Sequence, residues 1–175
     1  MASPALVSCS DDDDSNYNTW ETYRQWRTEN QEWVAAQEQL IDEETGQPYY
    51  TKVVPAWAPS TFVLMHWFND RTATEGNLTP LLTSWITTHY DLYLCDDTEV
   101  DSSAELEAGR FTSQLSGLID GWQIALMNMH VGDTVQIVVP YEAGYGNTSS
   151  ELIPPYSALR FNLRLVDIPD YEIRP

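Results

Sequence analysis

Aromatic and aliphatic side chains recur at the predicted ends of strands and loops, and Tyr145, between two glycines in the stretch GYG, is the clearest example. Packing alone explains a tyrosine on so flexible a loop poorly, because glycine allows backbone conformations that other residues rarely adopt. The sequence contains no GxSxG, GxGxxG or HExxH motif and no Walker loop, so standard catalytic signatures are absent. What remains predicts a shallow apolar pocket with few polar groups.

Charge and residue counts exclude several kinds of site. The chain has 175 residues, of which 8 are basic and 27 acidic, and its formal net charge of -19 repels phosphate backbones, so we expect no nucleic-acid partner. The three histidines, His66, His89 and His130, lack paired metal-ligand spacing, and the two cysteines, Cys9 and Cys95, form neither a disulfide framework nor a zinc cluster. We therefore expect no metal and no cofactor.

The stretch LVSC at Leu6–Cys9 resembles a bacterial lipobox, whose cysteine becomes the acylated N-terminus after signal cleavage. Four aspartates, Asp11–Asp14, follow at once, as in the export tag of some Gram-negative surface lipoproteins. We expect lipidation of Cys9 and a place at the bacterial cell envelope, on the outer membrane, with lipid as the only membrane anchor. The alternative is a chance match to LVSC in an acidic tail.

The elements that would position a pocket follow from the spacing of apolar residues. Thr19 to Ile41 show the periodicity of an amphipathic helix, which Gly46 and Pro48 then interrupt. We interpret the aromatic stripe of this helix as a surface that packs on the neighbouring domain. The alternative is an arm for dimerisation or for cradling a client protein.

Strand-like stretches follow this helix. Thr61–Asp70 predicts a strand, and Ser84–Leu94 alternates so that Tyr90 lies on its inner face. We expect CDDTEVDSS to form a turn, RFTSQL a short strand and LIDGWQIALMNM a short amphipathic helix, and further strands are predicted at 135–139 and 159–165.

This order of elements predicts the fold class. Strands, one short helix and strands again, without regular alternation of helix and strand, favour an α+β fold in which an antiparallel sheet packs on one helix. We divide the chain into a lipobox-like segment and acidic tether at 1–18, an N-terminal helix and extended linker at 19–60, and a sheet-and-helix domain at 61–170.

Five stretches occur in the order and near the spacing of a known family: HYDLYLCDDTEVDSS, GLIDGW, MHVGD, VPYEAGYG and IPPYSALRFNLRLV. Over roughly Pro80–Ile168 the chain resembles the FKBP-type peptidyl-prolyl cis-trans isomerases, and Trp20–Ser60 is more loosely similar to N-terminal extensions of bacterial lipoproteins that carry this domain. The resemblance implies a twisted antiparallel sheet wrapped around a short helix, with the pocket between them.

The same resemblance implies the residues of the pocket. The positions that match the family's catalytic residues are Tyr90, Asp101, Tyr145 and Trp122. The positions that match its substrate-binding walls are Val100, Phe111, Leu118, Ile119, Ile153 and Phe161. Outside the resemblance, Trp122 and Phe161 would be read as ordinary core residues, and Asp101 before two serines as a turn or cap.

The implied activity is rotation about X-Pro bonds, which resonance opposes with a barrier of about 18–20 kcal/mol and which needs neither a nucleophile nor a metal. The implied partners are proline-containing peptides or unfolded exported proteins, with FKBP-type macrolide inhibitors as further ligands.

Departures from the family pattern leave alternatives open. Val100 replaces the usual aromatic residue before the aspartate, the loop between Tyr145 and Pro154 is one residue shorter with no histidine, and the acidic stretch AELEAG lacks the usual basic partner. These changes weaken the expectation of high activity and of macrolide binding. The rival hypotheses are a catalytically weak binding or chaperone module, and a structural or nutrient-capture lipoprotein that uses the fold as a scaffold.

Overall fold

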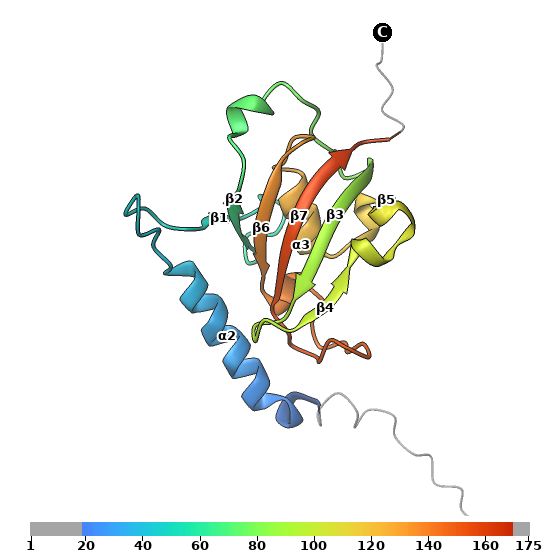
Figure 1. Cartoon of the computed structure of the whole chain (residues 1–175). Helices are drawn as coiled ribbons and strands as arrows, with labels where there is room; N and C mark the ends of the chain where they lie inside the picture. Colours follow the sequence, from blue (N-terminus) through green and yellow to red (C-terminus); the bar gives the residue numbers. More distant parts are fainter. Residues whose placement is uncertain (1–18, 170–175) are drawn as a thin grey trace, which may run out of the picture.

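The computed structural model describes residues 19–169, which form one antiparallel sheet with α3 on one face and α2 on the other (Figure 1). The helices are α2 (Arg24–Glu38) and α3 (Asp120–Leu126). The strands are β1 (Thr51–Val53), β2 (Val63–Trp67), β3 (Trp85–Tyr93), β4 (Glu99–Ser102), β5 (Phe111–Gln114), β6 (Thr134–Val139) and β7 (Leu159–Asp167). Short 3-10 turns occur at Arg71–Ala73, Ser103–Glu105, Glu107–Gly109, Leu115–Gly117 and Tyr141–Ala143.

The strand order is β1-β2-β6-β7-β3-β4, and β5 also pairs with β3. The last strand in the sequence, β7, therefore lies in the middle of the sheet between β6 and β3. This arrangement, with the N-terminal helix, confirms the predicted α+β fold.

Alternation along the central strands creates the core. In β3 the side chains of Ile86 and Leu92 are buried, whereas Trp85 at its start is half exposed. In β7 the buried positions are again every second residue, from Leu159 to Leu165. Because successive side chains of a strand point to opposite faces, the apolar face of both strands packs on α3.

Helix α3 lies close to the sheet because it contains a glycine at the contact. A Cβ atom on Gly121 would lie 2.8 Å from Cγ2 of Val139, well inside van der Waals contact. The glycine therefore allows α3 to approach β6, and this close approach places Trp122 against the sheet, where only 4% of its surface is exposed.

One edge of the sheet is an interrupted strand. β4 pairs with residues 91–93 of β3, and β5 pairs with residues 85–88 of the same strand, so the two short strands lie one after the other along β3. The expectation that CDDTEVDSS forms only a turn was wrong, because Glu99–Ser102 are in the sheet. Its polar side chains at Glu99 and Asp101 are exposed and give no apolar signal.

The N-terminal helix is shorter than predicted. It follows a helical turn at residues 19–22 and ends at Glu38, and Leu40 and Ile41 are exposed instead of extending the apolar stripe. The buried face of α2 consists of Arg27, Asn30 and Val34. Arg27 and Asn30 were not predicted to be buried, because the periodicity analysis counts only hydrophobic side chains.

Helix α2 packs on the sheet face opposite α3. Val34 joins Tyr50, Leu64 and Val138 in a second apolar cluster, with Trp33 partly buried against it. This confirms the interpretation of the helix as a packing element of the neighbouring domain. The segment predicted as a linker also contributes to the sheet, because β1 pairs with β2 N-terminal to the expected domain start at residue 61. β2 itself is shorter than the predicted strand at 61–70.

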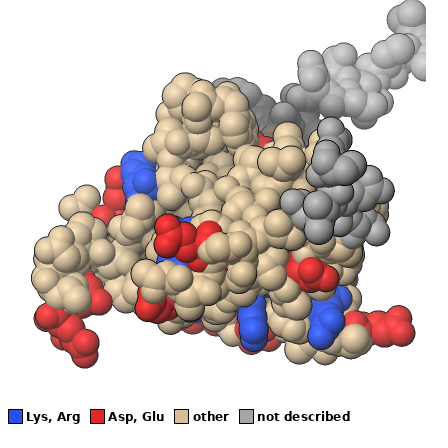
Figure 2. Space-filling view, turned by 90° about the horizontal axis from the view of Figure 1, so that it is seen from above, with Lys and Arg blue, Asp and Glu red and all other residues tan. Residues whose placement is uncertain are grey.

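The end of the molecule where β3 begins is mostly uncharged, with acidic and basic side chains scattered over it (Figure 2). Among its large apolar side chains, Leu81 is 70% exposed and Trp85 47% exposed. Residues 19–169 contain no helix long and apolar enough to cross a membrane. The lipobox-like segment, with Cys9 and the four aspartates, lies outside the described residues.

Candidate functional site

A cavity of about 160 Å³ lies where the start of α3 meets β3, β5 and the loop that carries Tyr145. The residues that line it are Tyr90, Phe111, Gly117, Leu118, Ile119, Trp122 and Tyr145. Six of these seven were predicted from the sequence, and only Gly117 was not. A cavity of this size is smaller than the roughly 300–1,000 Å³ of pockets for drug-sized ligands, so it suits a small group such as a single ring.

The walls of the cavity are aromatic rings that meet edge to face. The ring of Tyr90 lies 5.3 Å from that of Trp122 and 5.7 Å from that of Phe111, and Phe111 and Trp122 are 5.8 Å apart. Phe161 completes the set behind them, 5.4 Å from Trp122. Edge-to-face contacts of this kind are favourable and geometrically specific, so the rings hold one another in place.

Tyr90 adds a hydroxyl group to this aromatic wall. Its hydroxyl donates a hydrogen bond of 2.7 Å to Oδ2 of Asp101, which reaches across from β4 to β3. Burial of the ring, followed by the hydrogen bond to Asp101 and the negative charge of that carboxylate, raises the pKa of Tyr90 far above its usual range. Tyr90 is therefore a neutral hydrogen-bond donor throughout the physiological pH range.

Two serines after Asp101 fix the register of this edge. Oγ of Ser103 accepts a 3.0 Å hydrogen bond from the backbone N–H of Tyr90, and the Ser102 hydroxyl donates to Asp91 at 2.7 Å. Both serines are buried. Sequence reasoning assigned them no role, and their position directly after Asp101 was the available signal.

Tyr145 approaches the cavity from the other side. Gly146 adopts a φ of +61°, a conformation that glycine tolerates and side chains disfavour, so it turns the chain sharply after the tyrosine. Burial, and secondly the charge of Asp101, raise the pKa of the Tyr145 hydroxyl. The hydroxyl is thus neutral, and the charge of Asp101 acts on it as it does on the hydroxyl of Tyr90.

The residues entering α3 provide a backbone donor. Within residues 19–169 the N–H of Ile119 has no hydrogen-bond partner, whereas its carbonyl accepts from the N–H groups of Trp122 and Gln123. Leu118 and Ile119 are half buried and line the cavity. The free donor belongs to a residue that the resemblance assigned to a substrate-binding wall.

The remaining predicted residues surround the cavity rather than line it. Phe161 and Ile153 are 3% and 8% exposed and belong to the apolar core, while Val100 packs against that core from β4. Their expected role as walls in direct contact with a ligand stays a prediction. Of the three, Phe161 contacts the rings of both Trp122 and Tyr90.

A larger hollow of about 460 Å³ lies on the outer face of β3 and β7, beside residues 103–109. Its lining is dominated by polar residues such as His89, Asp91, Asn162 and Arg164, and His89 is already bonded to the carbonyl of Gly109 at 2.5 Å. We assign the site to the smaller cavity because the aromatic rings and the free backbone donor converge there.

Other reactive groups do not form a second site. In residues 19–169 no three histidine, cysteine or acidic side chains are grouped as metal ligands would be. Burial, and secondly the charge of Asp96, raise the pKa of the Cys95 thiol to about 11, so it stays protonated at neutral pH. Cys95 is partly buried.

The family described as FKBP-type peptidyl-prolyl cis-trans isomerase matches residues 77–166, just over half of the chain. The chain belongs to this family. The matched segment contains every residue that lines the cavity.

Curated FKBP-type relatives show the same local similarity. The chain is 38% identical over 96 residues to the FKBP-type 22 kDa peptidyl-prolyl cis-trans isomerase of Escherichia coli, which covers 54% of this chain and 45% of that protein. It is 36% identical over 97 residues to the macrophage infectivity potentiator of Trypanosoma cruzi, covering 55% of this chain and 49% of that protein. The chain therefore spans less than half the length of these relatives.

Solved FKBP-type structures confirm the fold. A peptidyl-prolyl cis-trans isomerase from Pseudomonas syringae superposes with a TM-score of 0.66 at 20% identity, covering 83% of this chain and 95% of that one. FkpA from Escherichia coli gives the same TM-score and identity, covering 85% of this chain and 63% of that one.

Proposed function

We propose that this FKBP-type chain is a peptidyl-prolyl cis-trans isomerase that rotates X-Pro bonds by favouring a twisted amide in its apolar cavity. The observation that carries this proposal is the convergence of Trp122, Phe111 and Tyr90 around a cavity sized for one ring. Membership of the family supports the same reaction.

The physical basis is differential binding. A planar X-Pro amide is stabilised by resonance, and that resonance makes its carbonyl oxygen a strong acceptor for water. The twisted amide loses resonance and interacts less with water, so transfer into an aromatic, water-poor cavity costs it less than it costs the planar form. An interaction that is more favourable in the transition state than in the ground state accelerates the reaction.

Each polar group then has a separate role. The rings of Trp122 and Phe111 hold the proline ring, and the N–H of Ile119 donates to a carbonyl of the substrate backbone. The hydroxyl of Tyr145 orients the peptide at the open side, and Asp101 holds the Tyr90 hydroxyl in place beside the twisted carbonyl. No proton is transferred, so this mechanism needs no titrating group near neutral pH.

A protease-coupled assay on short X-Pro peptides tests the proposal. We expect exchange faster than the uncatalysed rate, which has a time constant of tens to hundreds of seconds. A folded sample that gives only the uncatalysed rate would exclude the enzyme and favour the weak binding module. The observation that favours that second candidate is Val100, which leaves less aromatic surface beside Asp101 than the family pattern provides.

We further propose that the substrates are exported proteins and that the chain is tethered to the bacterial outer membrane through lipid on Cys9. The support is the LVSC stretch with its four aspartates. Mass spectrometry of the mature N-terminus from a membrane fraction tests the tether, and an unmodified Cys9 in that fraction would contradict it.

We also propose a weak affinity for FKBP-type macrolides. The cavity is small for a ligand of that size, and the loop after Tyr145 lacks the usual histidine. Calorimetric titration with a macrolide measures this affinity directly.

A further inference from the structure

The loop from Gly144 to Ala158, here called the rim loop, is attached to α2 by a buried polar contact. On the helix side, Asn30 is fully buried and Arg27 is 7% exposed. On the loop side, Tyr156 and Ser157 are 5% and 4% exposed. Polar groups are buried in folded proteins only where they are paired, so this contact is specific rather than a chance approach of two surfaces.

Two side chains of α2 are bonded directly to the end of the rim loop. Nε1 of Trp26 donates a 3.0 Å hydrogen bond to Oγ of Ser157, and Oδ1 of Asn30 accepts a 2.7 Å hydrogen bond from the backbone N–H of Ala158. Asn30 is itself oriented by its side-chain nitrogen, Nδ2, which donates a hydrogen bond of 2.8 Å to the carbonyl of Trp26. Both bonds link residues about 130 positions apart in the sequence.

Arg27 adds a stacked contact beside these bonds. Its guanidinium lies 3.2 Å from the ring centre of Trp20 and 5.5 Å from that of Tyr156, and one of its nitrogens donates to the carbonyl of Trp20. Tyr156 in turn meets Tyr141 edge to face at 5.5 Å. A planar cation between aromatic rings is favourable, especially where water is excluded.

These anchors continue through the rim loop toward Tyr145, which lines the cavity, and Ile153, which is buried in the core. The Ser157 hydroxyl donates to the carbonyl of Pro154 at 2.7 Å, one residue from Ile153. The N–H of Tyr156 donates to the carbonyl of Gly146 at 2.8 Å, one residue from Tyr145.

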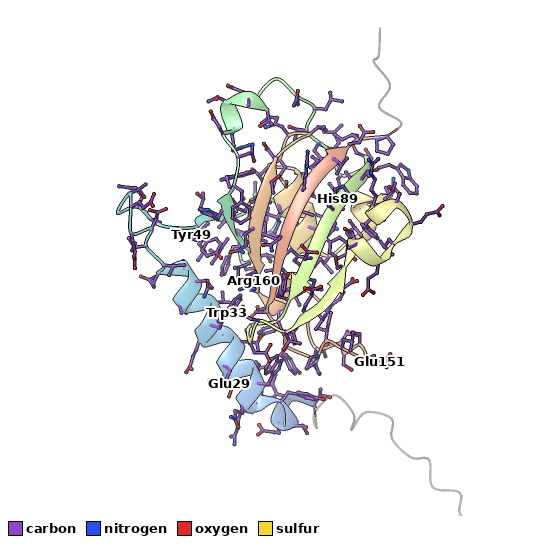
Figure 3. All side chains as sticks on the ribbon, viewed as in Figure 1. Glu29, Trp33, Tyr49, His89, Glu151 and Arg160 are labelled. Atoms are coloured by element: carbon purple, nitrogen blue, oxygen red, sulfur yellow. The ribbon has the colours of Figure 1, made fainter. Side chains whose placement is uncertain are left out.

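The conformation of Tyr156 shows that the loop is held rather than relaxed. Its φ is +63°, which side chains other than glycine rarely adopt. Such a conformation persists where surrounding contacts fix it, and here those contacts are Trp20, Arg27 and Tyr141. Figure 3 shows the opposite end of the loop, where Glu151 extends away from the sheet.

We propose that α2 is a positioning element for the isomerase site, and that Trp26, Arg27 and Asn30 fix the rim loop so that Tyr145 faces the cavity and Ile153 stays packed in the apolar core. This inference rests on the proposed function for its consequence in catalysis. The attachment of the rim loop to α2 does not depend on catalysis and is measured separately from it. These three residues are positioning residues, since none of them lines the cavity.

The decisive variant is Trp26→Phe, which keeps an aromatic ring and removes the N–H that binds Ser157. Its matched control is Trp33→Phe, the same change two turns further along α2, in the apolar cluster with Tyr50 (Figure 3). Amide hydrogen exchange of residues 145–156 is the first readout. We expect exchange about five- to tenfold faster in Trp26→Phe, the factor for losing one buried hydrogen bond, and unchanged in Trp33→Phe.

The second readout is kcat/KM on an X-Pro peptide. We expect a loss of about five- to tenfold in Trp26→Phe and none in Trp33→Phe, with both proteins folded. If kcat/KM is unchanged while the loop exchanges faster, the proposed link to catalysis is wrong. If the wild-type protein has no isomerase activity, the proposed function fails, and the exchange data alone decide the positioning.

A double-mutant cycle distinguishes loss of this contact from general unfolding of a variant. Ser157→Ala breaks the same link from the loop side and leaves α2 intact. We expect Trp26→Phe/Ser157→Ala to increase loop exchange no more than either single change, because both remove one interaction. Additive effects, or equal exchange in wild type and all three variants, would show that α2 does not hold the loop.

Discussion

Tyr90 joins the aromatic and the polar sides of the site in one side chain. Its ring contacts Trp122 and Phe111, and its hydroxyl is bonded to Asp101. A change at either end therefore acts on a different part of the proposed mechanism. The ring shapes the cavity. The hydroxyl, held by Asp101, fixes the orientation of the ring and the electrostatic potential beside the substrate carbonyl.

Replacement of Asp101 by alanine removes the acceptor for the Tyr90 hydroxyl. Two of the causes that raise the pKa of Tyr90 disappear, so we expect that pKa to move down toward its ordinary value. The loss of a hydrogen bond to a charged group predicts a fall in kcat/KM of about tenfold or more. Spectroscopic titration of the tyrosines and peptide kinetics measure the two effects. Asp96→Ala, in the turn before β4, is the control, and equal activity in folded Asp101→Ala would remove this carboxylate from the mechanism.

Replacement of Trp122 by leucine keeps an apolar side chain and removes the ring. We expect kcat/KM to fall by about tenfold or more, because a ring held between Tyr90 and Phe161 provides much of the apolar surface of the cavity. Trp85→Leu, the same change at a half-exposed position, should leave the rate unchanged. Similar rates for both variants would mean that Trp122 serves packing alone.

At the scale of elements, Asp133 joins the segment after β2 to the turn before β6. This carboxylate is fully buried before β6 and accepts hydrogen bonds from Asn69 at 3.0 Å, from Thr74 at 2.5 Å and from the N–H of His130 at 2.8 Å. Burial alone would raise its pKa, but these bonds and the charge of Arg71 outweigh burial and lower it. The stability it provides is present above the pKa of an unfolded aspartate and is lost as pH falls through the lowered native pKa.

Replacement of Asp133 by alanine should therefore destabilise the protein by about 2–4 kcal/mol, because several donors lose their acceptor. Urea unfolding at pH 7 measures the change in the free energy of unfolding. The difference between wild type and variant should shrink in acid, below about pH 4, as the wild-type carboxylate becomes protonated. A difference that stays constant into strong acid would contradict this account. Asp70→Ala, at an exposed cap two residues from Thr72, provides the comparison.

The elements that alternation predicts best are those with one apolar face. β3 was expected at 84–94 and spans Trp85–Tyr93, and β7 was similarly close. β4 was missed because an edge strand of four residues with exposed carboxylates has no apolar period. The cavity lining was found through the family resemblance, whereas the contact of α2 with the rim loop depends on polar pairs about 130 residues apart, which no local pattern reveals.

At the scale of the whole molecule, the segment that matches the family is not the whole folding unit. The match begins at residue 77, but β2 pairs with β6, and Val63 and Met65 are fully buried in the core. Removal of β2 would expose this core and leave β6 with an unpaired edge. Each buried side chain of this size contributes about 1.5–3 kcal/mol.

We therefore expect a fragment of residues 77–169 to lack cooperative unfolding. A longer fragment, 49–169, retains β1 and β2 and should unfold cooperatively although it lacks α2. Thermal denaturation followed by circular dichroism compares the two. A sharp transition in the shorter fragment would show that the sheet does not need its first two strands.

The central place of β7 has a consequence for how the protein is made. Among the described strands β7 is synthesised last, yet β6 and β3 pair with each other only through it. Until β7 emerges, the nascent chain has two separate half-sheets and an N-terminal helix whose partners at Ser157 and Ala158 have not been synthesised or are still in the exit tunnel. The sheet therefore cannot close before β7 has left the ribosome, and α2 finds its partners on the rim loop only at that late stage.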